Sequence, residues 1–255
     1  MTTASSITEA LYRIFVLRSQ PGMLARTHGE QPGLPRGRAS LPRAAVRANH
    51  RYRLLRAITA AVAEKGYARV TITDVVCRAR ISRNAFYEQF ADKEAAFVAA
   101  NDWGSGLMFE RIAQRTRALP PAARASERLA TAIRAYLEFL AQEPEFARTF
   151  LIDVFAAGPT ALERFRAAHR RFVANTRRWY ARARREDASL PPLPDDVFIA
   201  LVGAIHELAA TYVRERRTAE LPRLERTALR LHLATIAGWD AAPVRQPSST
   251  GSDGQ

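Results

Sequence analysis

One stretch, residues 47–97, constrains the fold of this 255-residue chain more than any other. It contains a short amphipathic segment, 73–79, followed by a turn and a second segment, 82–90. Ser82 is the expected N-cap of the second segment, because its hydroxyl can accept from an exposed backbone N–H. Arg80 lies in the turn, where a left-handed backbone would cost about 1 kcal/mol for a non-glycine residue. Two short helices joined by a tight turn are typical of a helix-turn-helix motif that reads DNA.

Apolar spacing predicts which sides of these two helices face the core. Thr71 or Thr73 can cap the first helix. Phe86 and Phe90 are four residues apart, so they share one helix face and should pack inward. Cys77 lies among apolar residues in mid-helix, and we expect a small buried packing residue rather than a reactive thiol.

The remaining polar positions form the predicted DNA-binding surface. Arginine can bind guanine through two hydrogen bonds and asparagine can bind adenine, while glutamate can accept from cytosine. The predicted base-reading residues are Arg83, Asn84, Glu88 and Thr73. The predicted phosphate-binding residues are Arg47, Thr71, Tyr87, Gln89 and Lys93, and Arg80, Ser82 and Ala85 complete the surface.

This stretch resembles the tetracycline-repressor (TetR) family of bacterial transcriptional regulators. The residues that match the family pattern are Gly66-Tyr67, Thr71-Ile72-Thr73-Asp74-Val75, Ile81-Ser82, Phe86-Tyr87, Phe90 and Asp92-Lys93-Glu94-Ala95. Four positions depart from it: Arg80 replaces the turn glycine, Val76 a small alanine, Gln89 the common His or Tyr, and Ala96 the usual leucine. The resemblance covers about a fifth of the chain, and none of these changes removes the DNA-binding chemistry.

The rest of the chain reads as helix after helix without strand-like alternation. Gly66 should end the first helix in a left-handed conformation. Helices are expected at 44–65, 93–118, 125–142, 144–157, 160–185, 195–217 and 222–239. We therefore predict an all-α protein in which a three-helix DNA-binding domain (44–98) precedes a helical ligand-binding and dimerisation domain of about six helices (99–240).

The two ends of the chain have a different composition. Residues 21–45 are rich in Pro, Gly and Arg, so they should contribute nothing to a packed core, and we predict that 1–43 is a largely disordered basic arm. Residues 1–20 are either a short amphipathic helix or a wrongly assigned start, with Met23 as an alternative. The tail 241–255 is predicted to be disordered.

Two further properties are implied by the resemblance. The last two helices would pair with those of a second copy, so that a homodimer reads an inverted-repeat DNA operator, and the helical domain would bind a small-molecule effector. Aromatic walls suit a flat or lipophilic ligand. The candidate lining residues are Trp103, Met108, Phe109, Tyr136, Phe139, Phe150, Phe155, Trp179 and His206, although each also suits an ordinary core.

Charge and composition limit the alternatives. The formal net charge is +14, which favours an acidic polymer as partner. Cys77 is the only cysteine, so no internal disulfide can form, and a reducing, cytoplasmic location is expected. No apolar run of about 20 residues, the length of a membrane span, is evident from the sequence. His206-Glu207 begins like a zinc-protease motif, but Ala210 stands where the second histidine is needed. We expect no catalytic residues, no metal and no cofactor; a helical interaction module that has lost specific DNA binding remains the second reading.

Overall fold

The computed structural model describes residues 22–25 and 43–239, and within these ranges it contains helices and turns but no strand. The predictions for the N-terminal helix, most of the basic arm and the tail lie outside the described residues. In chain order the elements are α2 (Arg43–Lys65), η1 (Tyr67–Arg69), α3 (Ile72–Ala79), α4 (Arg83–Tyr87), α5 (Lys93–Arg117), α6 (Ala125–Gln142), α7 (Pro144–Leu151), η2 (Asp153–Ala156), α8 (Pro159–Glu186), α9 (Asp195–Arg214), η3 (Thr218–Leu224) and α10 (Glu225–Ala237). The prediction of an all-α fold is confirmed.

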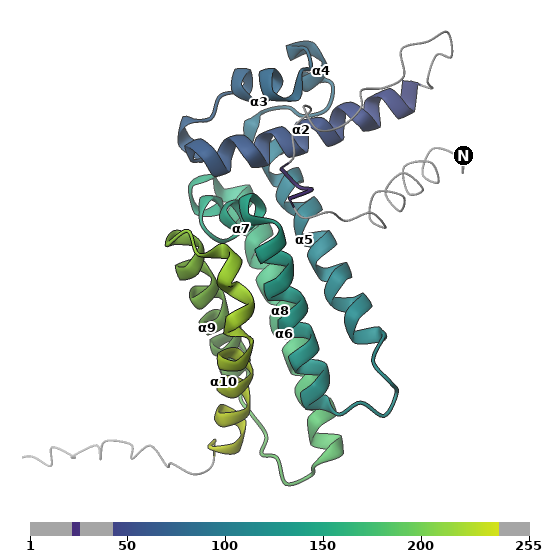
Figure 1. The fold of residues 1–255 in the computed structure, drawn as a ribbon, viewed down its shortest axis with the longest axis vertical. Coiled ribbons are helices and arrows are strands. Elements are labelled where there is room, and N and C mark those ends of the chain that lie inside the picture. Colours follow the sequence, from purple (N-terminus) through teal and green to yellow (C-terminus); the bar gives the residue numbers. More distant parts are fainter. Residues whose placement is uncertain (1–21, 26–42, 240–255) are drawn as a thin grey trace, which may run out of the picture.

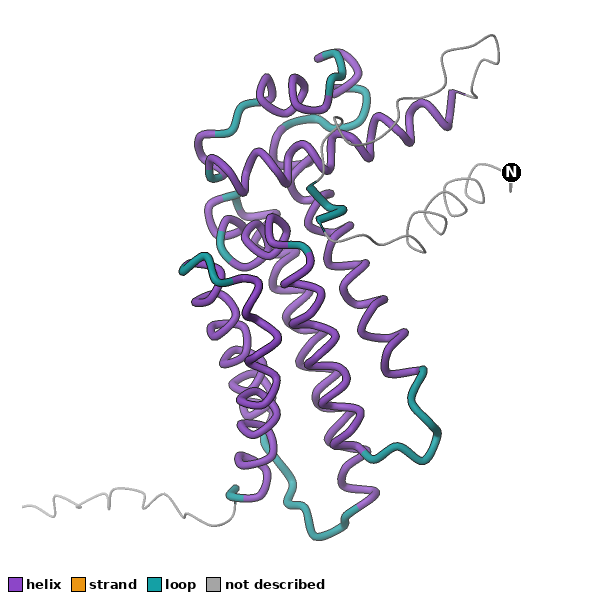
Figure 2. The backbone as a smooth tube through the Cα atoms, in the orientation of Figure 1, coloured by secondary structure: helices purple, strands orange, loops and turns teal. Residues whose placement is uncertain are grey.

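The molecule has a head and a body, as Figures 1 and 2 show. In the head, α2 lies across the top of the body and carries α3 and α4 on its outer side. The body is a bundle in which α5, α6, α8, α9 and α10 run roughly along the long axis. Each part has its own apolar core: Ile58, Phe86 and Phe97 are fully buried in the head, and Leu137 and Leu140 in the body.

The first helix and the turn of the helix-turn-helix form as the sequence predicts. Thr71 caps α3 through a reciprocal capping box: its hydroxyl accepts from the Asp74 N–H at 3.2 Å, and the Asp74 carboxylate accepts from the Thr71 N–H at 2.8 Å. Arg80 has φ 50° and ψ 50°, the left-handed conformation expected for the turn. Arg53 of α2 donates to the backbone carbonyls of Ala79 and Arg80, and therefore fastens this turn to α2.

The second helix of the motif is shorter than predicted. Ser82 is its N-cap and accepts from the Ala85 N–H at 3.2 Å, but α4 ends at Tyr87 rather than at Phe90. The Phe90 N–H still bonds to the Phe86 carbonyl at 2.9 Å, so the chain turns away only after Phe90 has reached the core. Asp92 then caps α5 by accepting from the Ala95 N–H at 2.7 Å.

The prediction for Cys77 is wrong, because its side chain is exposed. Helix α3 has eight residues, and one side of it contacts the core through Val75, Val76 and Ala79. A residue directly after Val76 points about 100° away from it around the helix, which places Cys77 on the outer side.

Helix α5 joins the head to the body and crosses α7 at very short range. A Cβ atom added to Gly104 would lie 2.2 Å from Cε2 of Phe146, whereas one added to Gly106 would meet nothing within 4 Å. Phe146 is 1% exposed and stacks on Phe150 with ring centroids 5.3 Å apart, so its ring has no free space to move into. Gly104 therefore permits the close crossing of α5 and α7.

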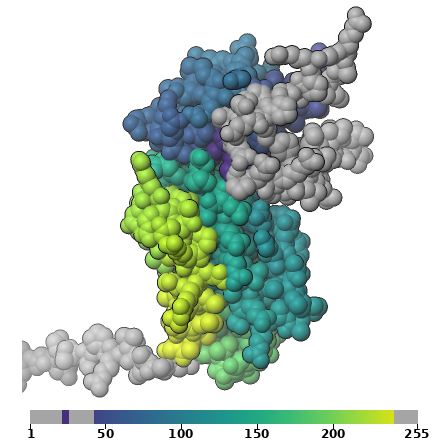
Figure 3. Space-filling view, in the orientation of Figure 1, coloured from purple at the N-terminus to yellow at the C-terminus, as the bar shows by residue number. Residues whose placement is uncertain are grey.

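Residues 23–25, which lie within the predicted arm, are packed, contrary to expectation. Leu24 is 1% exposed and belongs to the body core, with Met23 and Ala25 also buried. The Glu143 carboxylate accepts from the backbone N–H groups of Met23 at 3.0 Å and Leu24 at 2.8 Å. In Figure 3 these residues appear as a small purple area between the head and the body. Composition alone did not predict this because the surrounding residues are Pro-, Gly- and Arg-rich.

Helix α9 corrects a second expectation from composition. It is the one described helix that is long and apolar enough to cross a membrane, and 39% of its most apolar window is buried within the chain. It packs against α7, α8 and η3, which is the position of a core helix in a bundle. Its apolar sequence is therefore compatible with packing inside the protein.

Candidate nucleic-acid interface and ligand cavity

The predicted base-reading side chains lie together on the outer surface of the head. Arg83 and Asn84 are in the first turn of α4 and are exposed, and Glu88 follows at its end. Tyr87 is 50% exposed and sets its ring edge-to-face against buried Phe86, with centroids 5.5 Å apart. The other exposed members of the predicted surface are Arg47, Thr71, Thr73, Arg80 and Ser82.

Three predicted interface residues are half-buried: Ala85, Gln89 and Lys93. The Lys93 ammonium donates to the backbone carbonyls of Tyr67 and Val70, both at 2.9 Å, and lies 4.1 Å from the Tyr67 ring centroid. Burial lowers the pKa of Lys93. Lys93 thus fastens the first turn of α5 to the head. The Gln89 amide nitrogen is buried and has no hydrogen-bond partner among the described residues, so its side chain is not presented for a phosphate in this conformation.

Ion pairing within the head pairs two of its carboxylates and leaves two arginines of the predicted DNA-binding surface unpaired. The Lys65 ammonium lies 2.6 Å from the Asp74 carboxylate, and this bond together with the Thr71 capping bonds holds the pKa of Asp74 well below its usual range. Glu64 pairs with Arg78. Arg80 and Arg83 have no carboxylate partner among the described residues, so their charge is available to an external anion.

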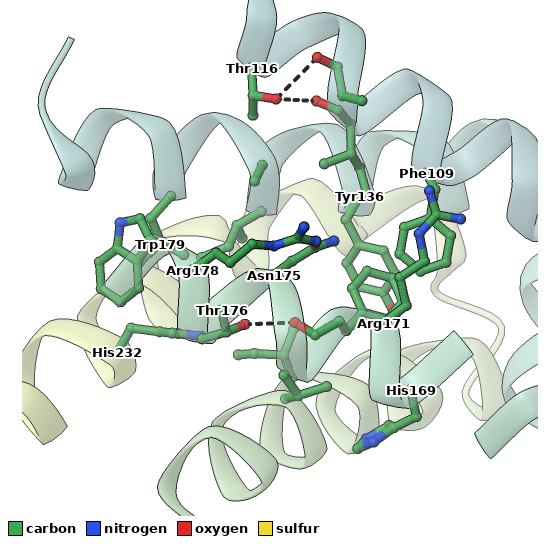
Figure 4. Close-up of a pocket in the computed structure, with 18 of the residues that line it drawn as sticks. Phe109, Thr116, Tyr136, His169, Arg171, Asn175, Thr176, Arg178, Trp179 and His232 are labelled. Atoms are coloured by element: carbon green, nitrogen blue, oxygen red, sulfur yellow. Dashed lines mark hydrogen bonds between the residues drawn. The ribbon is translucent and has the colours of Figure 1, made fainter. Parts of the chain in front are cut away.

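The body contains a cavity of about 510 Å³ that is lined by residues of α5, α6, α7, α8, α9 and α10. This volume lies in the range of small-molecule sites, about 300–1,000 Å³. Five of the nine predicted lining residues do line it: Phe109, Tyr136, Phe150, Trp179 and His206. Figure 4 shows Phe109 and Tyr136 on one side of the cavity and Trp179 towards the other.

The other four predicted residues lie elsewhere. Met108 and Phe139 are buried in the body core, so they are packing residues. Trp103 sits between the two cores and contacts Tyr52 edge-to-face at 5.4 Å. Phe155 is 58% exposed because it lies in the short η2 turn after α7. Hydrophobicity identified these residues, but it does not distinguish a cavity wall from a core or from a surface turn.

The largest omission in the sequence-based set is a polar stripe on α8. Arg171, Asn175, Arg178 and Arg182 recur at helical spacing and all line the cavity. Arg182 is already paired with Glu186 at 3.0 Å, whereas Arg171 lies 4.0 Å above the Phe109 ring and Arg178 donates to Asn175. The signal in the sequence was an arginine-rich face of this helix, which is ordinarily a solvated surface.

Three histidines line the cavity without forming a metal site. Burial, assisted by the nearby His169, lowers the pKa of His206 to about 4, and burial also lowers the pKa values of His169 and His232. His232 Nδ1 lies 2.8 Å from the Ala228 carbonyl and must be the donor, because a carbonyl oxygen only accepts. The imidazoles are therefore neutral near pH 7. The described residues contain no group of three or more side chains placed to hold a metal ion.

Comparisons with known proteins agree with this arrangement. Residues 54–100 match the family model described as bacterial regulatory proteins of the tetR family. Residues 122–213 match the model described as a tetracyclin repressor-like C-terminal domain. The two matches together span more than half of the chain. The chain belongs to the TetR family. No curated protein matches it.

Solved structures of TetR-type regulators share the fold. The fatty acid degradation regulator FadR from Bacillus halodurans superposes with a TM-score of 0.66 at 14% identity, over 73% of this chain and 96% of that one. FadR from Bacillus subtilis, solved in complex with stearoyl-CoA, gives 0.63 at 16% identity, over 73% and 97%. A tetR-family regulatory protein from Rhodococcus RHA1 gives 0.58 at 20% identity, over 71% and 96%. At these identities the likeness establishes the fold alone.

Proposed function

We propose that this TetR-family protein is a homodimeric transcriptional regulator that binds an inverted-repeat operator and is released from it by a small molecule. The observation that carries the DNA-binding part is the exposed first turn of α4. Ser82 caps it, and Arg83 and Asn84 project from it without partners among the described residues. These side chains have the donors and acceptors needed to read base edges in the major groove. Arg47 and Arg80 supply flanking charge for phosphates.

The dimer is supported by an uncovered apolar face on the last two long helices. Ile199 of α9 is 50% exposed and Leu233 of α10 is 40% exposed. Exposed Ala200 and half-buried Gly203 lie near Ile199 on α9, and a Cβ on Gly203 would meet nothing within 4 Å. Small residues between large apolar ones allow two helices to approach closely. A second copy would cover this face and place two reading heads on one duplex.

Ligand response is supported by the cavity, which touches α5, the helix that connects body and head. A ligand releases DNA only if it binds the DNA-incompetent conformation more tightly. The stearoyl-CoA complex of the B. subtilis FadR makes long-chain acyl thioesters the first compounds to screen. Whether the protein represses or activates depends on where its operator lies relative to a promoter.

The decisive experiment for DNA binding is selection of duplexes from a random pool at physiological salt. We expect an enriched inverted repeat. On that operator, Arg83→Ala should cost about 1–3 kcal/mol and relax preference at one base pair. Arg185→Ala, which removes an exposed arginine at the end of α8 remote from the head, is the charge-matched control. Equal losses on every sequence would refute base reading, and enrichment of no sequence would favour the interaction-module alternative.

The dimer has a separate test. Ile199→Asp should convert a dimer into a monomer in sedimentation experiments, because it buries a charge in the apolar contact. Phe155→Asp is the control, since Phe155 is even more exposed but lies on η2. Retention of the dimer by Ile199→Asp would place the contact elsewhere.

A further inference from the structure

We propose that the effector of this protein is an anionic amphiphile, whose acidic group is bound by Arg171 and Arg178 of α8 while its apolar body fills the cavity. This inference rests on the ligand role proposed for the cavity and adds the chemical class of the ligand and the residues that select it.

The first argument is the sign of the charge around the cavity. Its lining contains four arginines and no aspartate or glutamate. The three lining histidines are neutral near pH 7, as their lowered pKa values indicate, so the arginines alone set the sign. A cationic ligand would meet uncompensated like charge, whereas an anion would gain charge-assisted hydrogen bonds.

The second argument is that two of the four guanidinium groups have no carboxylate partner among the described residues. Arg128 donates to the carbonyls of Thr116, Pro120 and Ala123, and Arg182 pairs with Glu186, so both hold the protein together. Arg171 and Arg178 pair with no carboxylate in the described part of the chain. Arg171 rests on the Phe109 ring at 4.0 Å, and an aromatic face leaves the N–H donors at the guanidinium edge available.

The third argument is position. Both side chains line the cavity and are nevertheless exposed, so they lie where the cavity meets solvent. They are two helical turns apart, about 10 Å along α8, which is within reach of two long side chains that converge on one group. Figure 4 shows Arg178 extended over the cavity in the direction of Tyr136, and Arg171 beside Phe109. An acidic group held at this rim would leave the rest of the ligand pointing inward.

The interior suits an apolar body. Phe109 and Phe172 pack at 4.5 Å between centroids, and Tyr136 lies 5.2 Å from Phe172. The hydroxyl protons of Thr116 and Thr176 are already donated to backbone carbonyls of their own helices. Few polar donors therefore remain inside, and the arginines at the rim are the main polar selectors.

The test is calorimetric titration of the full-length protein with probes that differ only in the head group. Decanoate and decyl phosphate are the anions, and 1-decanol is the neutral match; 2-naphthoate and its methyl ester repeat the comparison with a flat body. We expect one or both anions of a matched set to bind at least ten-fold more tightly than the neutral compound. Preference for the carboxylate or for the phosphate would identify which acidic group the rim accepts.

Variants assign the selection to the two arginines. Arg171→Gln and Arg178→Gln should each weaken anion binding about ten-fold or more, as expected for a charge-assisted bond, and leave the neutral match unchanged. Arg166→Gln, on the same helix but outside the lining, removes the same charge and should change nothing. Equal binding of neutral and anionic probes, unchanged anion affinity in both variants, or no binding of any anion at millimolar concentration would overturn the proposal.

Operator release is measured separately, so that the two proposals can fail separately. Anions that bind but leave the selected operator bound would support the ligand class and refute the switch. Neutral compounds that release the operator would support the switch and overturn the ligand class.

Discussion

The crossing of α5 over α7 makes one substitution have opposite effects at two neighbouring positions. Gly104→Ala and Gly106→Ala each gain about 1 kcal/mol of helix propensity, because both lie inside α5. At Gly106 nothing opposes this gain, since the added methyl group meets open space. At Gly104 the methyl group would sit 2.2 Å from the Phe146 ring, well inside van der Waals contact.

The Phe146 ring is packed too tightly to move aside. It stacks on Phe150 at 5.3 Å and meets Phe139 edge-to-face at 5.8 Å. Overpacking of this kind typically costs about 1–3 kcal/mol, and here the severity of the overlap favours the upper end. We therefore expect Gly106→Ala to raise the free energy of unfolding by about 1 kcal/mol and Gly104→Ala to lower it by about 1–2 kcal/mol. Urea unfolding at one fixed protein concentration measures both. A change of the same sign in the two variants would refute the close-crossing argument.

The remaining predictions concern the docked segment, pH and the turn. Leu24→Ala should lower the free energy of unfolding by about 2–4 kcal/mol. A chain that begins at Met23 should be more stable in urea than one that begins at Arg26, because only the longer chain retains the docked residues 23–25. Burial raises the pKa of Glu143 from 4.5 to about 7, so the folded state holds this proton more tightly than the unfolded state. The free energy of unfolding should therefore fall as the pH rises from 4.5 to about 7. Glu143→Gln should abolish this fall in unfolding midpoints measured against pH. The lowered pKa of His206 acts in the opposite sense, with stability lost as pH falls from 6.5 to about 4, so His206→Gln should flatten the acid side of the same curve. Arg80→Gly should raise the melting temperature, because glycine adopts the left-handed conformation without strain. It should also weaken binding to all duplexes and reduce by about one the slope of log affinity against log salt concentration. Unchanged DNA affinity would show that Arg80 is not part of the interface.

The sequence predicted helix ends and caps accurately where they depend only on residues nearby in the chain. The bounds 125–142 for α6 are confirmed, because an amphipathic stripe is followed by Pro144 at the first position of the next helix. The left-handed Arg80 and the Ser82 cap are confirmed for the same reason: both depend on backbone geometry within a few residues.

Predictions that depend on distant segments were less accurate. Nothing near Leu24 in the sequence indicates that Glu143, 119 residues away, would accept its N–H. The prediction that Cys77 is buried was wrong because the eight-residue α3 presents only one narrow side to the core. Arg171 and Arg178 are absent from the predicted lining because the cavity is formed by six helices, and no periodicity of α8 reveals it.

The continuity of α5 has a mechanical consequence. The hydrogen bonds of Lys93 hold its first turn against the head, and Phe109 lines the cavity about 24 Å further along the same helix. At that lever length, a tilt of only about 5° displaces the far end by roughly 2 Å. In a two-fold assembly both heads move, and the mismatch of roughly 4 Å exceeds the 3.4 Å rise of one base pair. A ligand that fits the cavity and tilts α5 by this angle would therefore misalign the two heads of the proposed dimer with an inverted-repeat operator. Neither head would need to unfold or change its shape.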